Sequence, residues 1–231
     1  MQVWIPPEGR DEYEAAAKAA ALRGTYHSLD LGNGVKIEGQ YDMDQYLGNY
    51  GLPDDLRGKT ALDVGTATGY FAFELERRGA AVTAIDLAEP SVFQTARRLL
   101  GSQVRYIQKN LLDLDESFGK FDLVNCGSVL LHVRDIFGAV QCLRAVCQGI
   151  AIVATAVNDD ERLRDVSVLE VVGQKAADGD YWTYWSPNMR GLGKMLLSAG
   201  FSRVEDVSVF MLASRPEYGY RTLHGVVKAY A

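Results

Sequence analysis

The sequence predicts an α/β protein with a doubly wound, mostly parallel sheet. Short apolar runs alternate with helix-like segments between Thr60 and Val157, which is typical of parallel strands joined by crossover helices. The run GIAIVATAV is apolar throughout, as expected for a central strand that is buried on both faces. The 231 residues, 48% of them hydrophobic and 23% charged, are enough for one substantial core.

The first part of the chain differs in composition from the rest and is predicted to form a cap. An alanine-rich stretch from Glu12 to Leu22 predicts a helix, and the Gly- and Tyr-rich residues that follow include VKIEG, which suggests a hairpin. The polar turn LPDDLRGK then ends the segment. We therefore assign residues 1–58 to a cap and residues 59–231 to the main domain.

The main domain begins with regular strand and helix signals. The predicted helices are Gly69–Arg78 with Gly79 after its end, Pro90–Leu100 with Pro90 in its first turn, and Asp135–Cys147. The predicted strands are TALDV, AAVTAID, VRYIQKN, FDLVNCG and GIAIVATAV.

The end of the chain breaks this alternation. A helix is predicted over Asn188–Ala199, with Ser186 as its N-cap. Two strands follow, FSRVEDVSVFML and RTLHGVVKAY, and the gap ASRPEYGY between them is too short for a crossover helix. The sequence therefore predicts a seven-stranded sheet that ends in an antiparallel hairpin.

A glycine-rich turn follows the first strand of the main domain. It reads Asp63-Val64-Gly65-Thr66-Ala67-Thr68-Gly69. A dinucleotide fingerprint starting at Gly65 would need glycine where Ala67 and Tyr70 stand, and a P-loop would need a lysine after Gly69. The spacing Asp-x-Gly-x-x-x-Gly thus excludes both motifs, and an ordinary tight turn remains the alternative to a different nucleotide site.

The second strand ends in an acidic residue, Asp86. A carboxylate at this place in a doubly wound sheet can accept hydrogen bonds from two ribose hydroxyls. The alternative is that Asp86 caps the following helix.

The pattern Asp-x-Gly-x-x-x-Gly resembles motif I of the class I S-adenosylmethionine-dependent methyltransferases, which have a Rossmann-like fold. The segments YHSLDLGNGVKIEGQYD, LPDDLRGKTALDVGTATGYFAFELERRGAAVTAIDL and YWTYWSPNMRGLGKMLLSAGF resemble a subgroup related to the enzymes that modify the wobble uridine of tRNA (the mo5U and cmo5U type). That subgroup includes many uncharacterised bacterial methyltransferases.

The resemblance implies S-adenosylmethionine as the cofactor and places its contacts at the strand ends. Asn110 would reach the adenine amine and Leu111 would pack on the ring, with Asp113 as the alternative if the strand ends later. The implied cofactor-binding residues are Asp63, Gly65, Thr66, Gly69, Tyr70, Phe71, Asp86, Leu87, Asn110, Leu111, Gly127 and Ser128.

The resemblance also implies where the acceptor would lie. His132 follows the fourth strand and His27 lies in the cap, so both are candidate general bases. The alternative for His132 is a capping or packing role, and we expect His224 to be structural. Residues 158–186 are expected to form an acceptor lid, although simple loop packing explains their aromatic rings equally well. The candidate acceptor-binding residues are Tyr26, Trp182, Tyr184 and Trp185.

The charge of the chain bears on the acceptor. The net charge of -6 and the pI of about 5.1 disfavour a nucleic-acid acceptor, so we expect methyl transfer to O or N of a small molecule. A tRNA-modifying enzyme and a catalytically silent partner subunit remain alternatives. No metal site, membrane contact, signal peptide or disulfide framework is expected, which indicates a cytoplasmic protein. The acceptor, the oligomeric state and the use of an ordinary or a modified methyl donor stay open.

Overall fold

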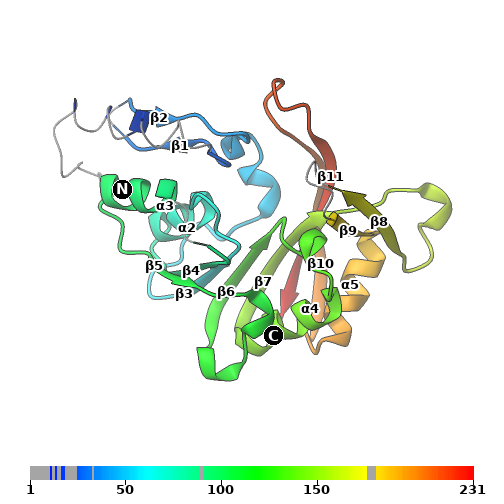
Figure 1. Ribbon diagram of the computed structural model, residues 1–231. Helices are drawn as coiled ribbons and strands as arrows, with labels where there is room; N and C mark the ends of the chain where they lie inside the picture. The colour runs from blue at the N-terminus through cyan, green and yellow to red at the C-terminus, as the bar shows by residue number, and fades with distance from the viewer. Residues whose placement is uncertain are drawn as a thin grey trace. The chain divides into compact units, whose positions relative to one another are not determined.

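A computed structural model describes residues 25–32, 34–88, 91–175 and 181–231, together with residues 11, 14, 17 and 18. It contains a seven-stranded sheet in the order β10-β11-β7-β6-β3-β4-β5 and two separate two-stranded sheets (Figure 1). The predicted α/β class and the seven-stranded, mostly parallel sheet are confirmed. The chain divides into two compact units, which are described separately.

The first unit comprises Met1–Leu47, Pro53–Lys109 and Ala213–Tyr220. The strands that it contributes to the seven-stranded sheet are parallel in the order β3-β4-β5, as predicted from the alternating pattern. The elements are β3 (Thr60–Val64), α2 (Tyr70–Arg77), β4 (Ala81–Asp86), α3 (Ser91–Leu99) and β5 (Arg105–Gln108). Pro90, the predicted first-turn residue of α3, lies outside the described residues.

Apolar side chains join the helices of the first unit to its strands. Phe73 of α2 stacks on Phe93 of α3 with ring centroids 5.3 Å apart, and Phe93 also contacts Tyr106 of β5. Leu62 and Ile85 on the strands are almost fully buried. Each such side chain contributes about 1.5–3 kcal/mol by leaving water, so this core holds the turn after β3 in place.

The predicted cap hairpin is present as β1 (Leu29–Asp30) and β2 (Lys36–Ile37), which pair antiparallel. Two short 3-10 helices follow, η1 (Met43–Gln45) in the first unit and η2 (Leu47–Tyr50), which lies almost wholly in the second. The predicted helix Glu12–Leu22 falls largely outside the described residues; within it, residues 14, 17 and 18 are helical.

The second unit comprises Gly48–Leu52, Asn110–Leu212 and Arg221–Ala231. In it β6 (Phe121–Gly127) runs parallel to β7 (Cys147–Ala156), and β11 (Arg221–Tyr230) runs antiparallel to β7. The remaining strand of its sheet, β10 (Arg203–Ala213), lies beside β11, as predicted. The helices are α4 (Ile136–Val146) and α5 (Met189–Ser198), with short 3-10 turns at Leu111–Asp113 (η3), Glu116–Phe118 (η4), Leu130–His132 (η5) and Glu161–Leu163 (η6).

The segment between β7 and α5 contains a hairpin that the sequence analysis did not predict. Strand β8 (Leu169–Lys175) pairs antiparallel with β9 (Tyr181–Pro187). The prediction that Ser186 caps the next helix is wrong, because Ser186 belongs to β9. The N-cap is Asn188, whose Oδ1 atom accepts the Gly191 amide at 2.8 Å. Among the described residues, no helix is long and apolar enough to cross a membrane.

Candidate functional site

The glycine-rich turn after β3 has a backbone that few residue types can adopt. Gly65, Ala67 and Gly69 all have positive φ angles, of 71°, 48° and 98°. Ala67 therefore occupies the left-handed region, which costs a non-glycine residue roughly 1–2 kcal/mol. The amides of Gly65 and Thr66 donate to the Ile85 carbonyl, which ties the turn to β4. The turn is thus held in a strained shape by the sheet beside it.

Asp86, the predicted ribose-binding residue, stabilises this turn directly. One carboxylate oxygen accepts the Ala67 amide at 2.8 Å, and the other accepts the Leu87 amide at 2.7 Å. Each carboxylate oxygen can accept a further hydrogen bond. Leu87 beside it is 65% exposed, which leaves an apolar side chain next to the carboxylate.

The segment around His27 contacts the turn within the first unit. The backbone amide of His27 donates to the Thr68 hydroxyl at 3.0 Å, across 41 residues of sequence. The His27 ring is packed among Tyr26, Tyr70 and Phe71, with centroids 4.7 to 6.2 Å away. Burial lowers the pKa of His27 to about 3, so the imidazole is neutral at pH 7 and is a weak base.

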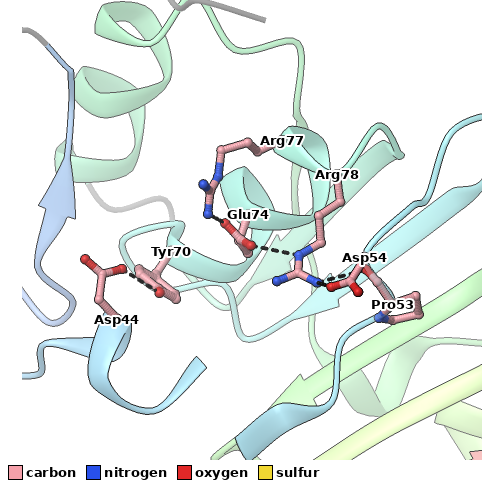
Figure 2. A network of polar contacts seen from close by, with 7 residues as sticks. All are labelled: Asp44, Pro53, Asp54, Tyr70, Glu74, Arg77 and Arg78. Carbon is pink, nitrogen blue, oxygen red and sulfur yellow. Dashed lines mark hydrogen bonds and ion pairs between the residues drawn. The ribbon is translucent and has the colours of Figure 1, made fainter. Parts of the chain in front are cut away.

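A polar network anchors α2, the helix that begins at this turn (Figure 2). The Tyr70 hydroxyl donates to Asp44 of η1 at 2.8 Å. One turn further, the buried Glu74 carboxylate accepts from Arg77 and from Nε of Arg78 at 2.7 Å. Arg78 also donates to the Pro53 carbonyl at 2.9 Å. These contacts hold the start of α2 in one orientation.

The residues predicted to hold the adenine ring begin the second unit. Strand β5 ends at Gln108, so Asn110 lies two residues past the strand and Asp113 lies five residues past it. Its Oδ1 atom accepts the Leu112 amide at 2.9 Å and thereby caps η3. Leu111 is buried. The amide oxygen of Asn110 retains one lone pair for a donor such as an amine.

Strand β6 ends at the two small residues that were predicted to contact the cofactor. Gly127 pairs with Ala154 of β7, and the Ser128 amide donates to the Ala154 carbonyl at 2.8 Å. Ser128 has a φ of 57°, which is rare for a residue with a side chain. Strained residues of this kind occur preferentially at functional sites.

His132 lies in η5, just after β6, and its ring is oriented by the β8–β9 hairpin. Its Nδ1 atom lies 2.6 Å from the Trp182 carbonyl oxygen. A carbonyl only accepts, so Nδ1 carries the hydrogen and Nε2 presents a lone pair. Burial lowers the pKa of His132 and the hydrogen bond to Trp182 partly offsets this shift. His132 is therefore neutral at pH 7 in the tautomer that a general base requires.

The aromatic residues of β9 contact the same loop. The indole nitrogen of Trp185 donates to the carbonyls of Val133 and Arg134, both at 3.0 Å. The Arg134 guanidinium lies over the Tyr184 ring, 5.5 Å from its centroid. Trp182 packs against the His132 ring at 4.4 Å and remains 57% exposed. Three of the predicted aromatic residues thus surround the His132 loop.

The predicted site residues fall into two groups. The first unit brings the glycine-rich turn, Asp86, Leu87, Tyr70 and Phe71 together with Tyr26 and His27 of the cap. The second unit brings Gly127, Ser128 and His132 together with the aromatic residues of β9. Sequence reasoning missed two residues beside Ser128, namely Tyr50 and His224, because no local pattern connects them to β6.

Comparison with known proteins bears on both of these groups. Residues 61–149 match the sequence model of the family described as "Methyltransferase domain". Residues 61–149 are therefore similar in sequence to methyltransferase domains. The matched segment, which is less than half of the chain, runs from β3 into β7 and includes the glycine-rich turn, Asp86, Ser128 and His132.

Curated relatives of the chain include proteins named ubiquinone biosynthesis O-methyltransferase. The protein of that name from Methylocella silvestris is 35% identical over 159 residues, which are 64% of this chain and 59% of the relative. The one from Vibrio parahaemolyticus is 32% identical over 61% of this chain and 57% of the relative. The chain spans less than two thirds of the length of these relatives.

Solved structures show the same fold at low identity. The N-terminal domain of EvdMO1 with S-adenosylhomocysteine bound matches with a TM-score of 0.74 and 19% identity, covering 97% of this chain and 98% of that one. A second match is a Burkholderia thailandensis 1,6-didemethyltoxoflavin-N1-methyltransferase with bound 1,6-didemethyltoxoflavin and S-adenosylhomocysteine. Its TM-score is 0.56 and its sequence identity is 20%, and the match covers 96% of this chain and 81% of that one. The predicted Rossmann-like methyltransferase fold is confirmed, and the resemblance to the tRNA-modifying subgroup stays a prediction.

Proposed function

We propose that this protein transfers a methyl group from S-adenosylmethionine to an oxygen atom of a small molecule. The observation that carries the proposal is the glycine-rich turn of the methyltransferase domain, whose Ala67 amide is bonded to the Asp86 carboxylate. This contact joins the two strand ends at which a nucleoside binds in a doubly wound sheet.

The turn and its surroundings fit an adenosyl sulfonium cofactor. The Thr66 hydroxyl is buried and has no hydrogen-bond partner among the described residues, so it has the capacity to bond a ligand. The Asp86 carboxylate has acceptor capacity for ribose hydroxyls beyond its two backbone donors. The proposed cofactor-binding residues are Asp63, Gly65, Thr66, Gly69, Tyr70, Phe71, Asp86, Leu87, Asn110, Leu111, Gly127 and Ser128.

The choice of oxygen rests on two observations. The curated relatives are named as O-methyltransferases, and His132 has the tautomer needed to take a proton from a hydroxyl group. His27 is the weaker candidate, because its burial makes protonation unfavourable. We therefore assign the role of general base to His132.

The reaction needs few protein groups. When bound, the sulfonium supplies an electrophilic methyl carbon and a neutral thioether as leaving group. With the cofactor held by the glycine-rich turn and Asp86, His132 Nε2 would take the proton of the acceptor hydroxyl, and the sulfonium would supply the methyl group to that oxygen. The products are a methyl ether and S-adenosylhomocysteine, and the His132 imidazolium then returns its proton to water. Alignment and exclusion of water supply the remaining acceleration.

Tyr26, Trp182, Tyr184 and Trp185 are the proposed acceptor-binding residues. Aromatic rings suit a flat, partly apolar acceptor, and the hydrogen bonds of Trp185 hold β9 against the His132 loop. In this proposal residues 158–186 are a lid, residues 1–58 are a cap, and residues 59–231 are the catalytic domain.

Two other functions remain as alternatives. The cap and C-terminal segments resemble the tRNA wobble-uridine enzymes, whereas the net charge of -6 disfavours a polyanion. A catalytically silent subunit would not need Asp63, Gly65, Gly69 and Asp86, all of which are present.

Calorimetry and a methyl-transfer assay test the proposal together. S-adenosylhomocysteine should bind the full chain, and methyl-labelled S-adenosylmethionine should label a hydroxylated member of a panel of phenols, amines and total tRNA. Failure to bind S-adenosylhomocysteine would reject a cofactor-dependent enzyme. Labelling of tRNA with no labelled small molecule would replace the proposed acceptor class.

A further inference from the structure

Ser128 is connected to a buried histidine from the far end of the chain. The Ser128 hydroxyl lies 2.9 Å from Nε2 of His224, across 96 residues of sequence. Strand β7 places them together, because the Ser128 amide bonds the Ala154 carbonyl and His224 pairs with Ala156 in the antiparallel register of β11. This contact lies outside the roles assigned above to Ser128 and His132.

The direction of this hydrogen bond follows from the other ring nitrogen. His224 Nδ1 lies 3.2 Å from the Thr222 carbonyl oxygen, which can only accept, so Nδ1 carries the hydrogen. Nε2 must then accept, and the Ser128 hydroxyl donates to it. The Ser128 hydroxyl has one hydrogen, and His224 accepts it. Toward any other group, the Ser128 oxygen can therefore act only as a hydrogen-bond acceptor.

A buried tyrosine completes the arrangement. The Tyr50 hydroxyl is hydrogen-bonded to Ser128, and Tyr50 is 1% exposed. The Phe210 ring covers both partners, with centroids 5.9 Å from Tyr50 and 6.1 Å from His224. A hydroxyl oxygen has two lone pairs, so a donor hydrogen from Tyr50 leaves one lone pair on Ser128. Ser128 itself is only half-buried.

His224 is suited to holding Ser128 and not to removing protons. Burial lowers the pKa of His224 to about 4, so its ring stays neutral across the pH range in which a hydroxyl group is methylated. The ring therefore keeps Nε2 unprotonated, and the orientation of Ser128 does not change with pH between about 6 and 9.

We propose that Ser128, held by His224 and Tyr50, is a ligand-binding acceptor that selects a hydrogen-bond donor, either a second hydroxyl of the methyl acceptor or the α-ammonium of the cofactor. His224 and Tyr50 are positioning residues in this arrangement. Ser128 has a positive φ and follows β6 directly, two residues before η5, which carries His132. The inference rests on the proposed methyltransferase function.

The cofactor arm of the test uses calorimetry. S-adenosylhomocysteine and its deaminated analogue, which lacks the ammonium, are titrated into the wild type and Ser128→Gly. Glycine suits the positive φ, so this variant removes the hydroxyl and relieves strain. If the ammonium is the donor, wild type should prefer S-adenosylhomocysteine by about 10-fold, which corresponds to one charge-assisted hydrogen bond. Ser128→Gly should lose that preference.

The acceptor arm uses two phenols that differ by one hydroxyl, 3,4-dihydroxybenzoate and 4-hydroxybenzoate. If a hydroxyl is the donor, wild type should prefer the dihydroxy compound in KM by about 5- to 10-fold, with little change in kcat, and Ser128→Gly should not. His224→Gln offers an acceptor oxygen to Ser128 and should keep the preference. His224→Leu offers no acceptor atom to Ser128 and should lose the preference for the dihydroxy compound. If His224 were merely structural, the Gln and Leu variants would not differ in this preference.

Each outcome has one meaning. A preference lost in one arm supports the inference and identifies the ligand group. Equal preferences in wild type and Ser128→Gly in both arms would overturn it, even with S-adenosylhomocysteine bound normally. Imidazole nitrogen shifts that place the His224 hydrogen on Nε2 would also overturn it. A wild type that binds no S-adenosylhomocysteine would instead reject the proposed function.

Discussion

His132 Nδ1 and the Trp182 carbonyl oxygen lie 2.6 Å apart, although 50 residues separate them in the chain. This contact makes a backbone atom of β9 responsible for the tautomer of His132. A side-chain substitution at Trp182 leaves the carbonyl in place, so the ring contact and the hydrogen bond can be tested separately.

Replacing His132 tests the general base. His132→Ala should lower kcat by roughly 10²- to 10³-fold, because general-base catalysis is lost, while S-adenosylhomocysteine affinity should stay within about 2-fold. Trp182→Phe should retain most of kcat. In wild type, kcat/KM should decrease with falling pH only below pH 6.5, because the lowered pKa of His132 keeps the base neutral above that pH. Unchanged turnover in His132→Ala would remove this residue from the mechanism.

Replacing Asp86 tests the cofactor site and the turn together. An amide can accept only one of the two backbone hydrogen bonds, so Asp86→Asn should weaken S-adenosylhomocysteine binding at least 10-fold and lower the unfolding free energy by about 1–3 kcal/mol. Asp159→Asn, at an exposed position of the second unit, is the control and should change neither quantity. Full affinity in Asp86→Asn, measured by calorimetry, would contradict the ribose assignment.

Replacing Trp185 tests the attachment of the lid. Trp185→Phe keeps an aromatic ring and removes the donor to the Val133 and Arg134 carbonyls, so the hairpin should exchange its amide hydrogens faster. The KM of the acceptor should rise about 3- to 10-fold, in line with the loss of one or two neutral hydrogen bonds. Tyr184→Phe keeps the ring under Arg134 and serves as the matched control. Equal exchange rates in both variants would show that Trp185 does not anchor the hairpin.

The network in Figure 2 predicts a large loss of stability at Glu74. Glu74→Ala removes the buried carboxylate partner of the largely buried Arg78 guanidinium and leaves only the exposed Asp54 carboxylate at 3.4 Å, which should cost about 3–5 kcal/mol. Asp55 also pairs with an arginine, Arg57, but lies on the surface, and Asp55→Asn should cause no measurable change in urea unfolding. A Glu74→Ala protein that unfolds at the wild-type urea concentration would contradict this account.

His27 makes stability depend on pH. Its folded pKa of about 3 lies below the unfolded value of 6.5, so the unfolded chain binds more protons as the pH falls through 6.5. Stability is therefore complete above pH 6.5 and decreases below it. Between pH 7 and pH 5 this residue should cost about 2 kcal/mol of unfolding free energy. His27→Gln should lose that part of the pH dependence in urea titrations, and an unchanged dependence would mean that the pKa of His27 is the same in the folded and unfolded states.

The order of the main strands and helices could be predicted because it is encoded locally. The apolar run from Gly149 to Val157 and the glycines that follow α2 and α5 identify their elements without knowledge of the rest of the chain. Hairpin β8–β9 was not predicted, since the β8 segment has no regular alternation and gains its pairing only from β9. The N-cap of α5 was predicted two residues too early, because both Ser186 and Asn188 suit an N-cap and local sequence does not distinguish them.

The residues of the candidate site also divide into those that local sequence indicates and those whose state depends on distant segments. Asp63, Gly65, Gly69 and Asp86 could be proposed from their spacing and from the resemblance of the turn to motif I, because a turn that admits a nucleoside restricts residue types over a few consecutive positions. The state of each histidine was decided by tertiary structure: His27 is buried among rings, His132 bonds a carbonyl of β9, and His224 holds Ser128. Protonation and tautomer depend on burial and on partners from distant segments, and only the packed chain brings those groups within hydrogen-bond distance.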